Sequence, residues 1–489
     1  QPHACRQRCD ANLWRSPPSK PPAAQKSGPC CTCCTRSSQA TQKARAVSKA
    51  KLPQSSTLAR GAITGMTVAK LGAVRAGQRL RRPAAEPAAQ ALQDRADEVA
   101  LGKLLFQALS QLRGTALKVS QLLSMDTAVL PEGVRAELAQ ACHQVMPLNR
   151  ALIGRVFRQS FGQEPEQMFS HFEPVAFAAA SLGQVHRAEI SGLGPVAVKV
   201  QYPGIAATVP SDMRLLRATL KALGHGVVVL PDSTVVDRLL SEIEAALMQE
   251  LDYEREAQQL LWFAKHAAWP GVVIPRPVLT HSSRHVLTQE LLNGVHLDAW
   301  LAQQPSQQER NQFGQRLFDW FMHCAFELGQ LQADLHPGNF LFLSNGRLGV
   351  LDFGYTCAMS AGFRQNLAKA WTCAQDLPTE AQGLLASYQS MGFLKAELSL
   401  PAFQAEVLPS HTLLLDWQTE IFKSPVFDCK HKSVLPRPSK SMQKALNQYM
   451  HRVPAEMPAF DRAWLGLMHM LTRMGAQIRT SNRWIKSSG

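Results

Sequence analysis

The sequence predicts an α+β fold in which a small, strand-rich region precedes a larger, mostly helical one. Three observations support this prediction. Residues 93–125 carry apolar side chains at helical spacing, residues 172–200 alternate as strands do, and the chain after residue 360 returns to helical spacing. With 489 residues, of which 45% are apolar and 18% charged, the chain is large enough for one two-lobed domain with extensions.

The N-terminal region differs from the rest of the chain in charge and cysteine content. Residues 1–85 hold 16 Lys or Arg and one acidic residue, Asp10, whereas the remaining residues hold 36 of each sign. Six of the eleven cysteines lie among the first 34 residues. Because residues 1–60 are basic, rich in Ser, Ala and Pro and nearly free of acids, we expect a disordered leader of the organellar transit-peptide type. A leader with no targeting role is the alternative.

Charge and cysteine spacing also exclude some classes of function. The basic excess belongs to the leader, so the neutral remainder gives no sign of a nucleic-acid partner. The five later cysteines stand singly, without the spacing of a zinc site or a disulfide framework. The cluster Cys30–Cys34 has no second ligand cluster after it, so we interpret it as part of the leader.

Residues 61–170 are expected to form a helical extension. Pro131 and Pro147 mark breaks between its helices. The stretch Gly61–Ala76 is rich in small residues and is interrupted by two basic ones, which is typical of an amphipathic surface helix. No run of about 18 uncharged apolar residues occurs in the sequence, so we expect no transmembrane helix.

Residues 171–295 are expected to form the small lobe. Residues 172–190 are typical of a strand, a turn of small residues and a second strand, and residues 196–200 form a third strand after a Gly-containing hairpin turn. A long helical stretch is expected from about Asp212 to Ala267. At least two further strands are expected between residues 271 and 294.

Residues 296–489 are expected to form the helical lobe, which begins with a helix at 312–328. Residues 330–354 then supply a loop, a hairpin about Asn345-Gly346, and a final strand that ends in a tight turn. The chain after Ser360 is expected to be helical, apart from Pro-rich loops.

Three polar motifs point to phosphoryl transfer, which needs positive charge on the nucleotide phosphates, a metal bridge and an oriented nucleophile. Lys199 ends the pattern Val196-Ala197-Val198-Lys199, in which a strand fixes the ammonium group over the phosphates. Asp334 and Asn339 lie on one loop, where the acid is suited to face the nucleophile and the amide to bind a metal. Asp352-Phe353-Gly354 follows 18 residues after Asp334 and places a metal-binding carboxylate at a strand end.

A fourth motif is the small-residue loop Ala178–Gln184, which lies about one hairpin before Lys199. A kinase has its Gly-rich phosphate loop at this position. Alanine restricts the backbone more than glycine does, so this loop should be stiffer. The residues that we assign to the nucleotide are Ala178, Ala179, Ala180, Ser181, Gly183, Lys199 and Glu290.

Together these motifs resemble those of the UbiB/AarF family of atypical kinases over about residues 93–380. The family's Lys-x-Gly-Gln motif matches Lys118-Val119-Ser120-Gln121, with Ser120 in place of Gly. Its Glu-x-Asp motif matches Glu250-Leu251-Asp252, and its catalytic loop matches Ala333–Asn339. The resemblance implies a protein-kinase-like bilobal fold with the N-terminal helical extension packed on the lobes.

The resemblance also implies roles for individual residues. Glu256 is expected to pair with Lys199, and these two residues act with Asp334 as the catalytic set. Spacing alone suggests that Asp252 caps a helical turn. The residues given a regulatory role are Lys118, Gln121, Glu250 and Asp252, and the two acids are expected to hold Lys118.

The activity implied by the resemblance is that of an atypical kinase or ATPase that binds ATP or ADP with Mg²⁺. It would support prenylquinone biosynthesis of the ubiquinone type, or lipid homeostasis, at an anionic membrane surface. Its partners would include quinone-biosynthesis enzymes. We favour a mitochondrial over a plastid location, and a bacterial cytoplasm stays open.

Two alternative functions come from the same motifs. Gln332-Ala333-Asp334 replaces the kinase His-Arg-Asp, and no Ala-Pro-Glu follows Asp352, so a peptide-docking segment is missing. The form Asp-Leu-His-Pro-Gly-Asn also occurs in small-molecule phosphotransferases of the aminoglycoside and choline kinase type. A nucleotide-binding pseudokinase scaffold of a lipid-biosynthesis complex is the other alternative. The chain keeps the polar residues of the reaction, which are Lys199, Asp334, Asn339 and Asp352, and this argues against lost chemistry.

Overall fold

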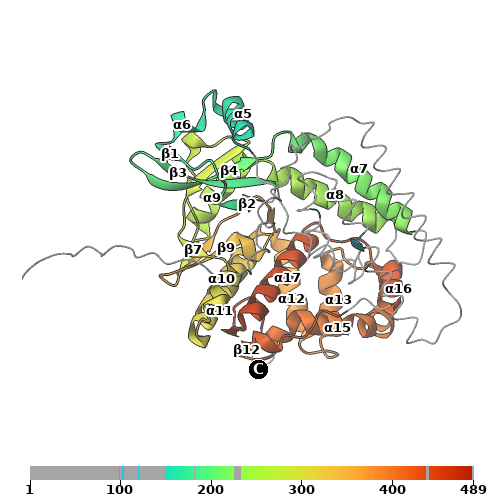
Figure 1. Ribbon diagram of the computed structural model, residues 1–489. Helices are drawn as coiled ribbons and strands as arrows, with labels where there is room; N and C mark the ends of the chain where they lie inside the picture. Colours follow the sequence, from blue (N-terminus) through green and yellow to red (C-terminus); the bar gives the residue numbers. More distant parts are fainter. Residues whose placement is uncertain are drawn as a thin grey trace, which may run out of the picture. The chain divides into compact units, whose positions relative to one another are not determined.

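The computed structural model describes residues 149–180, 182–224, 233–436 and 440–486, together with Val99, Gly102, Lys103 and Val119. These residues form an α+β fold, as the sequence predicts (Figure 1). The expected leader over residues 1–60 lies outside the described residues, as does most of the expected extension over residues 61–170.

A five-stranded antiparallel sheet forms the centre of the small lobe. Its strand order is β1, β3, β4 and β6, and β2 also pairs with β3. The strand bounds are β1 His171–Phe172, β2 Ala178–Ala180, β3 Gly183–Ile190, β4 Gly194–Gln201 and β6 Val286–Glu290. The strands predicted within residues 172–190 and at residues 196–200 are therefore present.

The alternation of side chains along β4 decides where Lys199 points. Val198 and Val200 are fully buried against Phe157 of α5 (Arg150–Phe161), which covers one face of the sheet. A short helix, α6 (Pro165–Met168), follows α5. Because successive side chains on a strand point to opposite faces, Lys199 lies on the other face, where it meets helix α9.

Three helices replace the single helical stretch predicted from Asp212 to Ala267. They are α7 Ile205–Gly224, α8 Ser233–Glu250 and α9 Tyr253–His266. The helical region begins at Ile205, earlier than the predicted Asp212, and α7 includes Pro210 in its interior. The predicted cap at Asp252 is confirmed, since its Oδ1 accepts a hydrogen bond from the Arg255 N–H at 3.0 Å.

The large lobe is mostly helical, as predicted. Its helices are α10 Leu297–Ala302, α11 Gln307–Met322, α12 Ala361–Ala374, α13 Ala381–Ser390, α14 Leu400–Ala402, α15 Leu408–Thr419, α16 Lys440–Tyr449 and α17 Met457–Met474. Single π-helical segments at His323–Leu328 and Phe403–Val407 continue α11 and α14. The helix predicted at 312–328 begins earlier, because Ser306 and Glu309 form a capping box at its N-terminus.

The remaining strands are short and lie in the connections between helices. They are β5 Val272–Val273, β7 Gly294–Val295, β8 Gln330–Gln332, β9 Phe340–Leu343, β10 Leu348–Val350, β11 Thr356–Ala358, β12 Val426–Asp428 and β13 Gln477–Arg479, with 3₁₀ turns at Leu279–His281, Pro337–Asn339, Glu420–Lys423 and Cys429–His431. The predicted hairpin at Asn345-Gly346 joins β9 and β10. Since β8 pairs with β11 and β9 with β10, the loops 333–339 and 351–355 lie next to each other.

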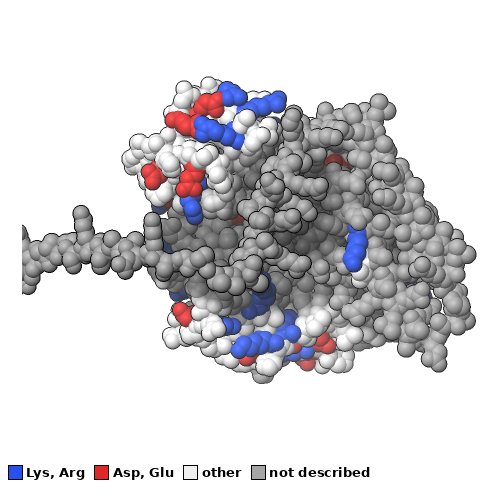
Figure 2. All heavy atoms as spheres, viewed as in Figure 1, with Lys and Arg blue, Asp and Glu red and all other residues white. Residues whose placement is uncertain are grey.

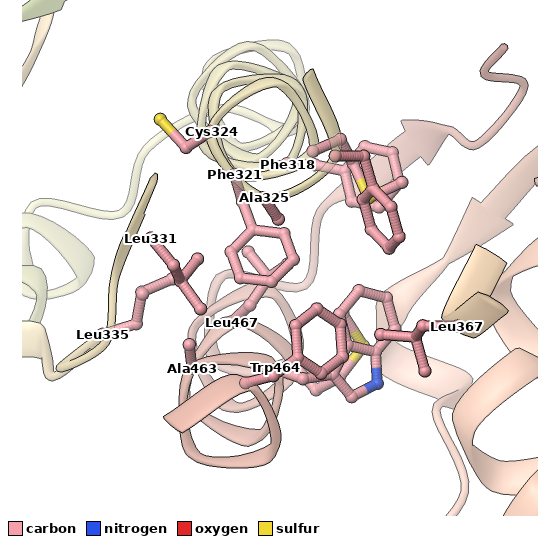
Figure 3. Close-up of a cluster of buried hydrophobic side chains, with 14 of the residues drawn as sticks. Phe318, Phe321, Cys324, Ala325, Leu331, Leu335, Leu367, Ala463, Trp464 and Leu467 are labelled. Atoms are coloured by element: carbon pink, nitrogen blue, oxygen red, sulfur yellow. The ribbon is translucent and has the colours of Figure 1, made fainter. Parts of the chain in front are cut away.

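The hydrophobic core of the large lobe packs against the loop 333–339. Leu331 and Leu335, on either side of Asp334, point toward α11 and α17 (Figure 3). The residues drawn around them include Phe318, Phe321, Cys324, Ala325, Leu367, Ala463, Trp464 and Leu467. Leu335 is 1% exposed, so the loop is fastened to the core by its own side chain.

Charged side chains of both signs are interspersed on the face in Figure 2, over the residues that the structure describes. Among the ion pairs of the described residues, Arg150 lies 2.6 Å from Glu166 and Lys423 lies 2.8 Å from Asp416. This mixture agrees with the neutral charge balance of the chain after residue 85. Within the described ranges, no helix combines the length and hydropathy that a membrane span requires.

Candidate nucleotide site

Lys199 is buried between two carboxylates that come from different parts of the chain. Its Nζ lies 2.6 Å from Glu256 Oε1 on α9 and 2.9 Å from Asp352 Oδ2, which follows β10. The exposed fractions of the Lys199 and Glu256 residues are 6% and 2%. The predicted pairing of Lys199 with Glu256 is therefore confirmed, and Asp352 joins the pair.

Burial and mutual charge set the protonation of this group. Burial alone would lower the pKa of Lys199, but the Asp352 and Glu256 carboxylates outweigh it and raise that pKa above its ordinary value. Burial and the neighbouring Asp352 raise the pKa of Glu256 to about 7, although Lys199 opposes the shift. The ammonium group is thus held charged, while Glu256 titrates near neutral pH.

Asp352 is oriented by the turn that follows it. Its Oδ1 accepts a hydrogen bond from the Gly354 N–H at 2.9 Å, which leaves Oδ2 facing Lys199. Phe353 is fully buried, with its ring centroid 4.5 Å from that of Phe263 on α9. The Phe353 side chain therefore anchors the turn in the core, while Gly354 and Lys199 hold the two oxygens of Asp352. Asp352 itself is only partly buried.

Asn339 and Asp334 are in direct contact, as their spacing on one loop suggested. Asn339 Nδ2 donates to the Asp334 carbonyl oxygen at 2.9 Å and to its Oδ2 at 3.1 Å. The Asn339 carbonyl in turn accepts a hydrogen bond from the Leu351 N–H at 2.9 Å, one residue before Asp352. Because the Asn339 amide nitrogen is engaged, its Oδ1 is the atom suited to a metal.

Gln332 is a site residue whose role the sequence reasoning missed. Its Nε2 donates to the backbone carbonyl of Asp334 at 3.0 Å and to that of Asp352 at 3.2 Å. This buried amide therefore links the two loops that carry the acids. The available signal was its place at the head of Gln332-Ala333-Asp334, where a kinase has histidine.

Helix α17 supports the same loop from the core side. Gly466 lies so close to the Leu335 carbonyl oxygen that a Cβ at this position would collide with backbone atoms. Only glycine allows the helix and the loop to approach this closely. The position of Asp334 therefore depends on a residue more than a hundred positions away in the sequence.

The alanine loop forms a tight β-hairpin rather than a longer turn. Ala178–Ala180 is the strand β2 and pairs with Val185–Gly183 of β3, so the turn predicted from small residues is shorter than expected. Gly183 packs directly on the Val200 carbonyl oxygen, one residue beyond Lys199, where a Cβ would not fit. Ser181 lies outside the described residues.

The remaining predicted site residues are placed as follows. Glu290 ends β6, and its Oε2 accepts a hydrogen bond from the Arg276 N–H at 3.1 Å. Glu250 is buried at the end of α8, near Gly354. Lys118 and Gln121 lie outside the described residues, so the expected contact of Glu250 and Asp252 with Lys118 stays a prediction.

The donor set fits a magnesium-bound nucleotide. Asp352 and Asn339 offer carboxylate and amide oxygens, which are the hard ligands that Mg²⁺ takes. Magnesium in phosphotransferases is held by one or two such side chains, with the rest of its shell from phosphates and water. Among the described residues, no cluster of three or more His, Cys, Asp or Glu side chains forms a metal site of its own.

A lysine on a strand paired with a helix glutamate, beside two adjacent acidic loops, defines the kinase-like class of phosphotransferases. A family model described as the ABC1 atypical kinase-like domain matches residues 140–381. The chain belongs to this family of ABC1 atypical kinases, the UbiB/AarF family. Its enzyme class is a kinase or ATPase-type phosphotransferase whose phosphate acceptor is unassigned.

Relatives extend over much of the chain. The atypical kinase COQ8 of Saccharomyces cerevisiae mitochondria is 28% identical over 76% of this chain and 72% of its own length. The mitochondrial atypical kinase COQ8B of Rattus norvegicus is 32% identical over 59% of this chain, and the match spans 54% of that protein. A solved structure, the Rv3197–erythromycin complex from Mycobacterium tuberculosis, shares 26% identity and a TM-score of 0.53 over 81% of this chain and 95% of that one. These matches confirm the kinase-like fold predicted from the sequence.

Proposed function

We propose that the chain binds ATP or ADP with Mg²⁺ and transfers or hydrolyses the terminal phosphate. The observation that carries this proposal is the buried contact of Lys199 with both Glu256 and Asp352. A lysine is seldom buried without a task or a partner, and here two acids hold its ammonium group beside the Asp334 loop. Two acids that hold one buried ammonium group are the arrangement that positions a phosphate-binding cation.

Each residue has a task in this reaction. Bound magnesium would neutralise charge on the phosphates, with Asp352 and Asn339 as its protein ligands. Lys199 would hold a phosphate oxygen, and Glu256 would fix the direction of its ammonium group. Asp334, held by the Asn339 amide at 3.1 Å, would face the attacking hydroxyl or water and accept its proton.

A binding and turnover experiment tests the proposal. ATP and ADP binding to the purified chain is measured with and without magnesium, followed by phosphate release with added quinone-precursor phenols and anionic liposomes. We expect nucleotide binding that depends on magnesium, and slow phosphate release that either the phenols or the liposomes accelerate. Nucleotide binding that ignores magnesium would contradict the proposal, and tight binding without any turnover would favour the pseudokinase scaffold.

The pathway and the compartment are also part of the proposal. Relatives from yeast and rat are named mitochondrial COQ8 kinases, and one from Arabidopsis thaliana is named chloroplastic. We infer support of ubiquinone-type biosynthesis, together with quinone-biosynthesis enzymes, in a mitochondrion rather than a plastid. Complementation of a yeast strain that lacks its COQ8 tests this, and failure of a well-expressed chain to restore quinone levels would count against it.

We further propose that the chain acts at an anionic membrane surface. Residues 51–82 hold seven Lys or Arg and no acidic residue. Each base near such a surface contributes about 1 kcal/mol, which salt screens. A chain that begins near residue 50 should co-sediment with anionic liposomes at low salt, and one that begins near residue 90 should bind far less. Equal binding by the two would contradict this part of the proposal.

A small-molecule phosphotransferase is the second candidate function. The observation in its favour is the similarity to the solved Rv3197 structure, which is a complex with the small molecule erythromycin. Under this candidate, phosphate would appear on an added alcohol or phenol rather than in water. Mass spectrometry of the phenols after the turnover assay separates the two, because only the phosphotransferase leaves a phosphorylated product.

A further inference from the structure

Arg255 on α9 reaches the loop that carries Asp352. It lies one residue before Glu256, and its half-buried side chain points to the turn that follows the acid. Nη1 donates to the Gly354 carbonyl oxygen at 3.0 Å, and Nη2 donates to Thr356 Oγ1 at 3.1 Å. One planar guanidinium group therefore holds two points of this loop at once.

The Gly354 contact extends to the carboxylate of Asp352. The Gly354 N–H donates to Asp352 Oδ1 at 2.9 Å, while the carbonyl of the same residue accepts from Arg255. Gly354 is thus fixed on both sides, and its orientation decides which oxygen of Asp352 faces Lys199. Glycine has more backbone freedom than other residues, so the hydrogen bond from Arg255 restricts the backbone conformation of Gly354.

A second side chain on α9 reinforces the first. Thr356 is 4% exposed, and its hydroxyl donates to Gln259 Oε1 at 3.2 Å while it accepts from Arg255. Gln330 Nε2 donates to the same Gln259 oxygen at 3.2 Å. Arg255 and Gln259 are four residues apart and share one face of the helix. Helix α9 is therefore bonded to both strands of the β8–β11 pair.

From these contacts we propose that Arg255 is a positioning residue for Asp352, and that it makes helix α9 and the Asp352 loop move as one unit. Glu256 holds Lys199 from the same helical turn, so a shift of α9 breaks the lysine pair and the loop contact together. A kinase with His-Arg-Asp uses that arginine to fix its activation loop, and Ala333 stands there in this chain. Arg255 contacts the loop that follows Asp352 from helix α9 instead. The inference rests on the proposed function.

The test is a magnesium titration of ATP binding by isothermal titration calorimetry on the full chain. Arg255→Gln should raise the magnesium concentration for half-maximal ATP binding about tenfold, which is the effect of losing the charge-assisted hydrogen bond to Gly354 that orients Asp352. ATP binding without magnesium should stay within about twofold, because Arg255 acts through the metal ligand and not on the nucleotide. Lys265→Gln, which changes an exposed cation on the same helix, is the matched control and should titrate like the wild type.

Substitution of Thr356 provides a second test of the same contact, with a smaller change to the structure. Thr356→Ser keeps the hydroxyl and should titrate like the wild type, while Thr356→Val removes it and should shift the titration in the same direction as Arg255→Gln. If Arg255→Gln does not fold, the difference between the two Thr356 variants decides the question.

An unchanged magnesium requirement in Arg255→Gln overturns the inference, and so does an equal loss of magnesium-free binding, which would indicate general damage. Identical titration by the two Thr356 variants also overturns it. If the wild type itself shows no magnesium-dependent ATP binding, the proposed function fails first, and that result is visible before any variant is compared.

Discussion

Replacement of Lys199 by methionine probes the electrostatics of the buried group. The ammonium group is the shared partner of Glu256 and Asp352, at 2.6 and 2.9 Å. Methionine fills a similar volume but leaves two carboxylates facing each other with no cation between them. Removing one member of a buried ion pair lowers the free energy of unfolding by about 3–5 kcal/mol when the remaining group stays charged and buried. Glu256 can lose its charge by taking up a proton, so the loss of stability must depend on pH.

The size of this dependence follows from the pKa of Glu256. In the wild type burial raises that pKa from 4.5 to about 7, so the folded protein binds more protons than the unfolded chain, and stability falls as the pH rises between these values. Without Lys199 the pKa rises further, and the fall continues above pH 7. Each pH unit then adds about 1.4 kcal/mol to the difference between the variant and the wild type. Between pH 7 and 9 the added loss is about 3 kcal/mol.

Urea denaturation of the two proteins at pH 6, 7, 8 and 9 measures this difference. The Lys199→Met and Glu256→Gln double variant is the control, because it lacks the carboxyl that takes up the proton. Its stability relative to the Glu256→Gln single variant should change much less with pH. A Lys199→Met variant that loses the same stability at pH 6 and pH 9 would refute the reasoning about the coupled group.

Three further predictions follow from the site. The kcat/KM for ATP should rise through about pH 7 as Glu256 ionises and pairs with Lys199, and this limb should be lost in Glu256→Gln, measured as a pH–rate profile. Ala179→Gly should loosen the β2–β3 hairpin and change the ratio of ATP to ADP affinity, and calorimetry that gives the wild-type ratio would count against the loop. Gly466→Ala should push α17 off the Leu335 carbonyl, lower the melting temperature and reduce turnover about tenfold. An active, stable Gly466→Ala protein would contradict that contact.

Local patterns were enough to predict the parts of the site that lie within one segment. The β4 lysine, the helix cap at Asp252 and the turn at Asn345-Gly346 follow from strand, cap and turn preferences over a few residues. The pairing of Lys199 with Glu256 required the family resemblance, because 57 residues and two long helices separate the partners. Periodicity carries no information on such a contact.

The contacts that sequence reasoning missed join distant segments. Arg255 and Gly354 are 99 residues apart, and an arginine beside two acids on a helix looks like a solvated face. Gly466 looks like an ordinary weak point of a helix until α17 is seen to press on the Leu335 carbonyl. Helix α7 begins seven residues before the predicted Asp212 and contains Pro210, a residue that locally disfavours a helix interior.

The most direct test of the nucleotide site is ATP binding by wild type and Asp352→Asn, each with and without magnesium. Asparagine keeps the size of the side chain and its hydrogen bond from Gly354, so the fold should stay intact, as checked by circular dichroism. The account predicts that magnesium strengthens ATP binding at least about tenfold in the wild type and has no effect in the variant. Equal magnesium-dependent binding by the two proteins would show that Asp352 is not the metal ligand and would contradict the assigned site.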